Sequence, residues 1–176
     1  MLSRISRLGA CPGRLTRQLC SSTMLGLEVF DSACPSLFDG TKKVSVREFP
    51  LPPEVLGKEV CVLSRPDPPA GRPLPDEQAA GVGGFKVEGV ITFSASTTPY
   101  TSRAAFDADV SRHQVKPGSP QHAKYCGPAD GPWPGPLGEL FAWEISSARR
   151  VLPDWLAGTN GSPAIRRRFN AIFDVD

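Results

Sequence analysis

The sequence has few of the residues from which metal sites, disulfide frameworks and membrane spans are built. It contains two histidines and five cysteines with no C-x-x-C pair, so we expect no metal, no disulfide framework and no other cofactor. Its longest run without a charged residue, 89–102, is half Ser and Thr, whereas a membrane span needs about 20 mostly apolar residues. P-loop, G-x-G-x-x-G, G-x-S-x-G and H-E-x-x-H motifs are absent, which excludes the best-known sites for nucleotide binding, ester hydrolysis and zinc proteolysis.

Proline and glycine, in contrast, are abundant. The 19 prolines and 17 glycines make up about a fifth of the 176 residues, which excludes long uninterrupted helices. A hydrophobic content of 40% and a charged content of 22% are nevertheless typical of a globular chain, and the length suits one domain. Cys34, Cys61 and Cys126 are too far apart in sequence to suggest a cluster, and we expect them to be buried as small hydrophobic residues.

The positive charge is concentrated at the N-terminus. Residues 1–27 hold four arginines and no acidic residue, so the formal net charge of +2 becomes −2 from residue 28 onward, with 16 basic and 18 acidic residues. An arginine- and serine-rich segment free of acids is typical of an organelle transit peptide. We expect a mitochondrial matrix protein cleaved near residues 20–22, with a plastid location or an uncleaved basic extension as alternatives.

Apolar alternation and turn residues predict an α+β fold for residues 28–176, a small curled sheet or barrel with helices at its ends. We expect Gly89 to mark a β-bulge and Ser102 to cap a helix. The predicted strands are 43–49, 59–64, 85–94, 140–145 and 169–175. The apolar run of 59–64 indicates a central strand, and Arg166 to Arg168 fall in the connection between the last two strands. The helical segments are 31–40 and 102–113, and the long loops are 65–84 and 116–138.

The segment 40–47 carries the first residues that suggest chemistry. A glycine turn places Lys42 just before a strand, and Ser45 and Arg47 lie two residues apart on one face of that strand. Lysine and arginine together can bind a phosphate or the edge of a base. Spacing alone favours an amphipathic strand whose polar face is only solvated.

The pattern G-x-K-x-x-x-x-R at Gly40, Lys42 and Arg47, followed by a proline-rich turn and a V-x-L strand, resembles the ASCH domain, a relative of the PUA fold. Four further segments resemble motifs of the family and follow in the same order. Residues 85–93 are similar to its V-x-G-x-V-T-F strand, and residues 100–113 are similar to its Y-x-S-x-x-x-F-x-A-D…R-H helix. Residues 141–144 stand in place of its Y-G-W-V strand, and residues 168–174 are similar to its F-R-S-I-F-E closing strand.

The resemblance implies a PUA-like β-barrel of five to six strands with two or three short helices and a cleft that faces RNA or a modified nucleoside. Lys42 and Arg47 match residues of that cleft, and Ser45 stands where members often have Glu or Thr. In a hydrolase branch that acts on acetylated cytidine, a Lys, a Thr three residues later and a distant Glu are catalytic. Lys42 and Ser45 keep that spacing, and Glu88 is a candidate for the acid.

Other residues have two interpretations each. His113 either transfers protons at the cleft or packs at the end of a helix, where a partly positive ring complements the helix dipole. Trp143 either stacks on a base or belongs to the core. Arg166, Arg167 and Arg168 either bind the phosphate backbone or form a solvated surface run.

Three functions remain open from the sequence. The first is a mitochondrial module that binds RNA or a modified nucleoside. The second is an accessory subunit of a large organellar complex, such as a ribosome or a respiratory complex, with the two long loops lying on a partner. The third is a small amidohydrolase acting on acetylated cytidine through Lys42, Ser45 and Glu88.

Overall fold

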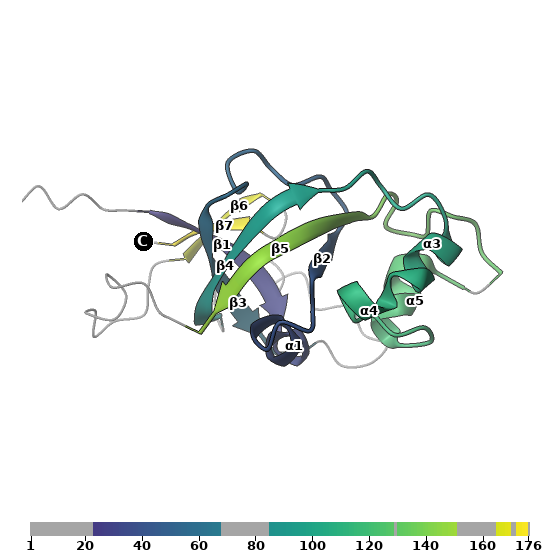
Figure 1. Ribbon diagram of the computed structural model, residues 1–176, viewed down its shortest axis with the longest axis horizontal. Coiled ribbons are helices and arrows are strands. Elements are labelled where there is room, and N and C mark those ends of the chain that lie inside the picture. Colours follow the sequence, from purple (N-terminus) through teal and green to yellow (C-terminus); the bar gives the residue numbers. More distant parts are fainter. Residues whose placement is uncertain (1–22, 68–84, 129, 151–164, 170–171, 176) are drawn as a thin grey trace, which may run out of the picture.

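The computed structural model describes residues 23–67, 85–128, 130–150, 165–169 and 172–175. They form an α+β fold in which a curled, mixed sheet of seven strands is flanked by short helices (Figure 1). The expected transit segment up to residue 22, most of the loop 65–84 and the connection 151–164 lie outside the described residues.

The sheet has the strand order β2-β5-β4-β3-β1-β7-β6. All neighbouring strands are antiparallel except β1 and β3, which run parallel. The strands, in sheet order, are β2 (Val44–Arg47), β5 (Phe141–Arg149), β4 (Lys86–Ser96), β3 (Glu59–Arg65), β1 (Met24–Phe30), β7 (Ile172–Val175) and β6 (Ile165–Phe169).

Two strand predictions are confirmed in detail. The apolar run of β3 lies at the centre of the sheet, where both faces are covered, and Val60 to Ser64 are all buried. Gly89 lies at a β-bulge, because Val62 pairs with Gly89 whereas Leu63 pairs with Val87, which leaves Glu88 as the extra residue. Gly89 has φ +158, and a Cβ there would lie 2.1 Å from the carbonyl oxygen of Arg149.

Two of the seven described strands were not predicted as such. β1 begins at Met24, four residues before the expected start of the domain, and it packs so closely that a Cβ on Gly26 would lie 2.5 Å from Leu63 Cδ1. β6 contains Arg166 to Arg168, which we had placed in a connection. It forms because residues 165–169 fold back antiparallel onto β7 at the edge of the sheet.

The described helices are all short. They are η1 (Asp31–Ala33), α1 (Cys34–Phe38), α3 (Arg103–Ala108), α4 (Val110–His113) and α5 (Pro120–Cys126). The predicted cap is confirmed, since the Ser102 hydroxyl accepts a hydrogen bond from the Ala105 amide at 3.1 Å. The expected helix 102–113 is interrupted at Asp109, which gives α3 and α4.

Helix α5 corrects the prediction of a continuous loop over 116–138. Its start follows ordinary capping chemistry, because the Ser119 hydroxyl accepts a hydrogen bond from the His122 amide at 3.1 Å and Pro120 occupies the first turn. With seven residues it is as long as any described helix, and none of the described helices is long and apolar enough to cross a membrane.

The buried hydrophobic residues form separate clusters on the sheet. One cluster packs under β1, β3, β4 and β5 and includes Val62, Phe93 and Trp143. A second cluster attaches α3, α4 and α5 to the β2 and β5 side of the sheet, and its buried members are Val46, Phe106, Val115, Cys126 and Leu140. The three helices therefore sit together beyond β2, as Figure 1 shows.

Candidate functional site

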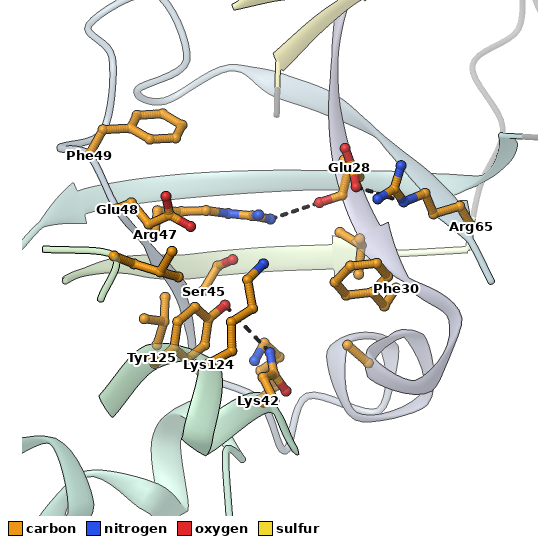
Figure 2. A pocket seen from close by; sticks show the side chains of 15 residues that line it. Glu28, Phe30, Lys42, Ser45, Arg47, Glu48, Phe49, Arg65, Lys124 and Tyr125 are labelled. Carbon is orange, nitrogen blue, oxygen red and sulfur yellow. Dashed lines mark hydrogen bonds and ion pairs between the residues drawn. The ribbon is translucent and has the colours of Figure 1, made fainter. Parts of the chain in front are cut away.

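A cavity of about 510 Å³ lies between β1, β2 and α5. Figure 2 shows that its walls come from segments far apart in the sequence, with β2 on one side, β1 on another and α5 below. The polar residues that line it and bear on function are Glu28, Lys42, Ser45, Arg47, Lys124 and Tyr125. The structure thus places the three residues of the 40–47 segment at one cavity.

Lys42 lies just before β2 and is 9% exposed. Its Nζ donates a hydrogen bond to the carbonyl oxygen of His113 at 2.6 Å, across 71 residues of sequence. Burial, together with the positive charge of Arg47, lowers the pKa of Lys42 from 10.5 to about 8. The ammonium therefore loses its proton much more readily than a lysine in water.

Arg47 extends from the end of β2 toward β1 (Figure 2), where its Nη2 donates to the carbonyl oxygen of Glu28 at 2.8 Å. The guanidinium carbon lies 5.9 Å from the centroid of the Trp143 ring. The buried Nε has no hydrogen-bond partner in the described part of the chain. Burial lowers the pKa of Arg47, although an arginine remains charged at any physiological pH.

Lys42 and the half-buried Arg47 have no ion-pair partner among the described residues. Glu28 and Glu48 both line the cavity, and their carboxylates act on Arg47 only as nearby negative charges. The carboxylate of Glu28 pairs with Arg65, whose Nε lies 2.7 Å from Glu28 Oε1. Two neighbouring cations without ion-pair partners in a partly enclosed site favour an anion or a group rich in acceptors as the ligand.

Helix α5 supplies three cavity residues that the sequence analysis did not single out, Gln121, Lys124 and Tyr125. Lys124 is exposed and adds a further cation to the lining, and Tyr125 presents a half-buried ring with its hydroxyl 3.5 Å from Gln121 Nε2. On the opposite side Phe30 already carries Arg65 over its ring at 5.4 Å. Tyr125 is the aromatic residue that α5 contributes to the cavity lining.

Glu88 does not join Lys42 and Ser45. The bulge at Gly89 gives Glu88 a position among basic side chains, where it pairs with Lys86 at 2.6 Å and Arg150 at 2.7 Å. These contacts lower its pKa, the hydrogen bond from Lys86 most of all. Glu88 lines a second cavity of about 410 Å³ and is not part of the first. The proposed catalytic set is thus not assembled at one place.

His113 is an interior residue and not a group at the cavity. It is fully buried, its Nδ1 accepts a hydrogen bond from the Val115 amide at 2.9 Å, and its Nε2 donates to the carbonyl oxygen of Phe106 at 2.8 Å. The ring also stacks on Phe106 with centroids 4.3 Å apart. Burial lowers the pKa of His113, so the ring is neutral and does not act as a cation at the helix end. Its contribution to the cavity is its carbonyl oxygen, which holds Lys42.

Trp143 belongs to the core. Its side chain is fully buried, its indole N–H donates to the carbonyl oxygen of Phe49 at 3.0 Å, and it makes edge contacts with Phe49 and Phe93. A base cannot stack on a ring whose faces and edges are already covered. Of the two interpretations given above, the structure supports the core residue.

The arginines of β6 lie away from the cavity. Arg166 and Arg168 are exposed, and Arg168 is 3.5 Å from Asp174 of the neighbouring strand. Neither Arg166 nor Arg168 lines the cavity that holds Lys42. β6 forms one end of the sheet in strand order, and β2, which carries Ser45 and Arg47, forms the other.

A second cluster of donor side chains joins α3 to α5. Donor atoms of Asp107, His122 and Cys126 all lie within 4.8 Å of one another, although we expect no metal site from the sequence alone. His122 and Cys126 are separated by one helical turn, a spacing that indicates a shared face only once residues 120–126 are known to be a helix. The three described cysteines are free and buried, as expected.

Comparisons with known proteins give no family for this chain. No protein-family model matches the sequence, and no curated protein matches it either. The function is therefore argued from the geometry of the cavity.

Proposed function

We propose that this protein is a mitochondrial module that binds RNA or a modified nucleoside, with a PUA-like fold of the ASCH type, and that the cavity between β1, β2 and α5 is its ligand site. One observation carries the proposal. Lys42 is buried and Arg47 is half-buried with a buried Nε, both lie at one cavity, and neither forms an ion pair with a carboxylate among the described residues. Keeping unpaired charges out of water costs several kcal/mol per ion, which a bound anion or acceptor would offset.

The chemistry of the two cations fits a nucleotide. Arginine offers several N–H donors in a fixed plane, and the Nε of Arg47 is without a partner, so it can bind a phosphate or the acceptor edge of a base. Lys42 adds a point charge, and Ser45 adds a hydroxyl from the same strand. Lys124, which is exposed at the cavity, can follow the backbone of a longer strand.

Size and charge favour a single unpaired nucleotide over a duplex. A volume of about 510 Å³ falls in the range of small-molecule pockets, and Tyr125 gives a planar surface on which a base can stack. Residues 28–176 have a formal charge of −2, which disfavours wrapping of a long nucleic acid around the domain. We therefore expect a local contact with an unpaired base and its flanking phosphates.

Fluorescence anisotropy with a labelled single-stranded RNA tests the proposal. Lys124→Ala should weaken binding at least about threefold because it removes an exposed cation at the cavity, and Arg47→Gln should weaken it more. Lys116→Ala is the matched control, since Lys116 is also an exposed lysine and does not line the cavity.

The salt dependence separates a local contact from non-specific binding. Two or three phosphate contacts on a single strand predict a slope of about −1.4 to −2.1 in a plot of log K against log salt. Absence of binding to RNA and to free nucleotides, or equal effects of Lys124→Ala and Lys116→Ala, would exclude the cavity as the site.

A second candidate is a hydrolase that uses the same cavity. The observation in its favour is that the pKa of Lys42 is lowered to about 8, which suits a general base for the nearby Ser45 hydroxyl. Incubation with acetylated cytidine should then release acetate, and both Lys42→Met and Ser45→Ala should abolish the release. Binding without turnover would leave the binding module as the function and exclude the enzyme.

A further inference from the structure

The contact between α3 and α5 contains a compact set of three different ligand types. Asp107 comes from α3, and His122 and Cys126 come from successive turns of α5. Asp107 Oδ1 lies 2.7 Å from His122 Nε2, and the donor atoms of all three residues lie within 4.8 Å of one another. The set is independent of the cavity described above, since none of its members lines that cavity.

We infer that Asp107, His122 and Cys126 form a site for a transition-metal ion, with Zn²⁺ as the ion that the donors fit. A thiolate, an imidazole and a carboxylate are the ligands found in zinc sites of proteins. Mg²⁺ and Ca²⁺ prefer oxygen ligands throughout and would gain little from Cys126 or His122. Three protein ligands leave a fourth tetrahedral position for water or another donor.

The distances are compatible with this ion after small side-chain movements. Bond lengths of about 2.0–2.3 Å place the donor atoms of a tetrahedral zinc site roughly 3.3–3.6 Å apart. The observed separations run from 2.7 Å to no more than 4.8 Å, which brackets that range. Asp107 and His122 would move slightly apart, and Cys126 would move slightly inward.

The exposed fractions of the three ligand side chains indicate where an ion would enter the site and on which side it would keep a water ligand. The side chain of Asp107 is 34% exposed and that of His122 is 10% exposed, whereas Cys126 is fully buried. An ion would therefore enter past Asp107 and keep a water on that side, with the sulfur as the innermost ligand. Within the described part of the chain, the Cys126 sulfur has no hydrogen-bond partner that it would lose.

Metal binding at this site requires its ligands to release protons. Burial raises the pKa of Cys126, so the metal-free thiol is protonated and the ion must displace that proton. The Nε2 of His122 exchanges its hydrogen bond with Asp107 for the metal, and a neutral ring then carries its proton on Nδ1. Metal affinity should consequently fall as the pH is lowered.

The site has a direct structural consequence. Lys124 and Tyr125 lie between the two ligands on α5, and both line the cavity. An ion that joins α5 to α3 would hold these two side chains in place, because a seven-residue helix has little stability of its own.

Cobalt titration under reducing conditions is the test. The full chain carrying Cys11→Ser and Cys20→Ser, which removes the thiols near the N-terminus, is titrated with Co²⁺ and then with Zn²⁺. We expect one equivalent of Co²⁺ to give a thiolate-to-metal charge-transfer band that Zn²⁺ abolishes and that millimolar Mg²⁺ leaves unchanged. The charge-transfer band is specific for a metal–sulfur bond, so binding elsewhere through oxygen or nitrogen does not imitate it.

Variants assign the ligands. Cys126→Ser and His122→Gln should each weaken binding more than about 100-fold, since loss of an outer-shell partner alone costs 10- to 100-fold. Cys34→Ser is the matched control, a buried cysteine outside the cluster. If the parent chain gives no saturable band at one equivalent, or if Cys34→Ser weakens binding as much as Cys126→Ser, the inference is wrong. The titration of the parent chain is interpreted first, so a variant that fails to fold does not obscure the result. RNA binding is not measured in this experiment, so its outcome does not depend on the proposed RNA site.

Discussion

Substituting Lys42 by Met should stabilise the protein and abolish its ligand binding. Lys42 is buried without a carboxylate partner, and its pKa is lowered from 10.5 to about 8. At 1.36 kcal/mol per pKa unit this difference corresponds to about 3 kcal/mol, by which the charged side chain destabilises the fold at neutral pH. The same charge is what an anionic ligand would contact, so stability and binding should change in opposite directions.

The net gain is smaller than the full electrostatic cost. Met leaves the carbonyl oxygen of His113 without the hydrogen bond that Lys42 Nζ donates at 2.6 Å. Losing a hydrogen bond to a charged group costs about 1.5–3 kcal/mol. We therefore expect Lys42→Met to raise the free energy of unfolding by about 1 kcal/mol at pH 7.

The difference in unfolding free energy between Lys42→Met and the wild type should change sign as the pH is raised. A folded-state pKa below the unfolded value means that the unfolded chain binds more protons between pH 8 and 10.5, so wild-type stability rises relative to the variant across this window. The variant should be the more stable protein below pH 8 and the less stable one near pH 10.5. Lys43→Met is the matched control, because Lys43 is the exposed neighbour.

Urea unfolding of the wild type and both variants at pH 7, 8, 9 and 10.5 measures these differences. The reasoning is refuted if Lys42→Met destabilises the protein by more than about 1 kcal/mol at pH 7, which would mean that the ammonium contributes net stability. It is refuted equally if the difference between variant and wild type is the same at every pH. RNA affinity measured on the same samples should be lost in Lys42→Met and kept in Lys43→Met.

Further predictions follow from the same coordinates. RNA affinity should be constant up to about pH 7.5 and should fall above pH 8 as Lys42 loses its proton, toward tenfold per pH unit, when measured by anisotropy between pH 6.5 and 9. Trp143→Phe removes the hydrogen bond to Phe49 and should lower the free energy of unfolding by about 1–3 kcal/mol with RNA affinity unchanged, whereas a stacking role would reduce affinity. Gly89→Ala should destabilise more than Gly57→Ala in urea unfolding, because both have positive φ but only Gly89 has an atom within 4 Å of the added Cβ. Residues 1–27 fused to a fluorescent protein should direct it to mitochondria in fluorescence microscopy, and a diffuse signal would count against the transit peptide.

Local signals in the sequence were sufficient for several elements. β3 was predicted as a central strand because its residues are apolar on both faces, and the bulge at Gly89 followed from a lone glycine in a strand. The start of α3 was predicted because a serine hydroxyl can satisfy a first-turn amide at Ser102. Each of these features depends on residues within a few positions of one another.

The elements that were not predicted either pair with strands distant in the sequence or lie in a segment whose composition is typical of a loop. β1 is stabilised by a parallel pairing with β3, about 35 residues along the chain, and by β7 near the C-terminus. Helix α5 lies in a segment rich in Pro and Gly, and only His122 and Cys126 mark its buried face. The sequence Ser119-Pro120 was the available signal, since a serine cap followed by proline is a common start of a helix.

Two of the missed elements, β1 and α5, decide what Lys42 and Arg47 can do. The spacing of the 40–47 segment fits both a solvated polar strand and a binding site, and β2 alone would leave its cations in water. In the folded protein β1 supplies the carbonyl oxygen that holds Arg47, the end of α4 supplies the one that holds Lys42, and α5 closes the remaining side. Burial by these covering elements lowers the pKa of both cations and leaves them without a carboxylate partner. Because a solvated strand needs no such cover and gains nothing from it, the enclosure of the charges is the physical reason to favour a ligand site.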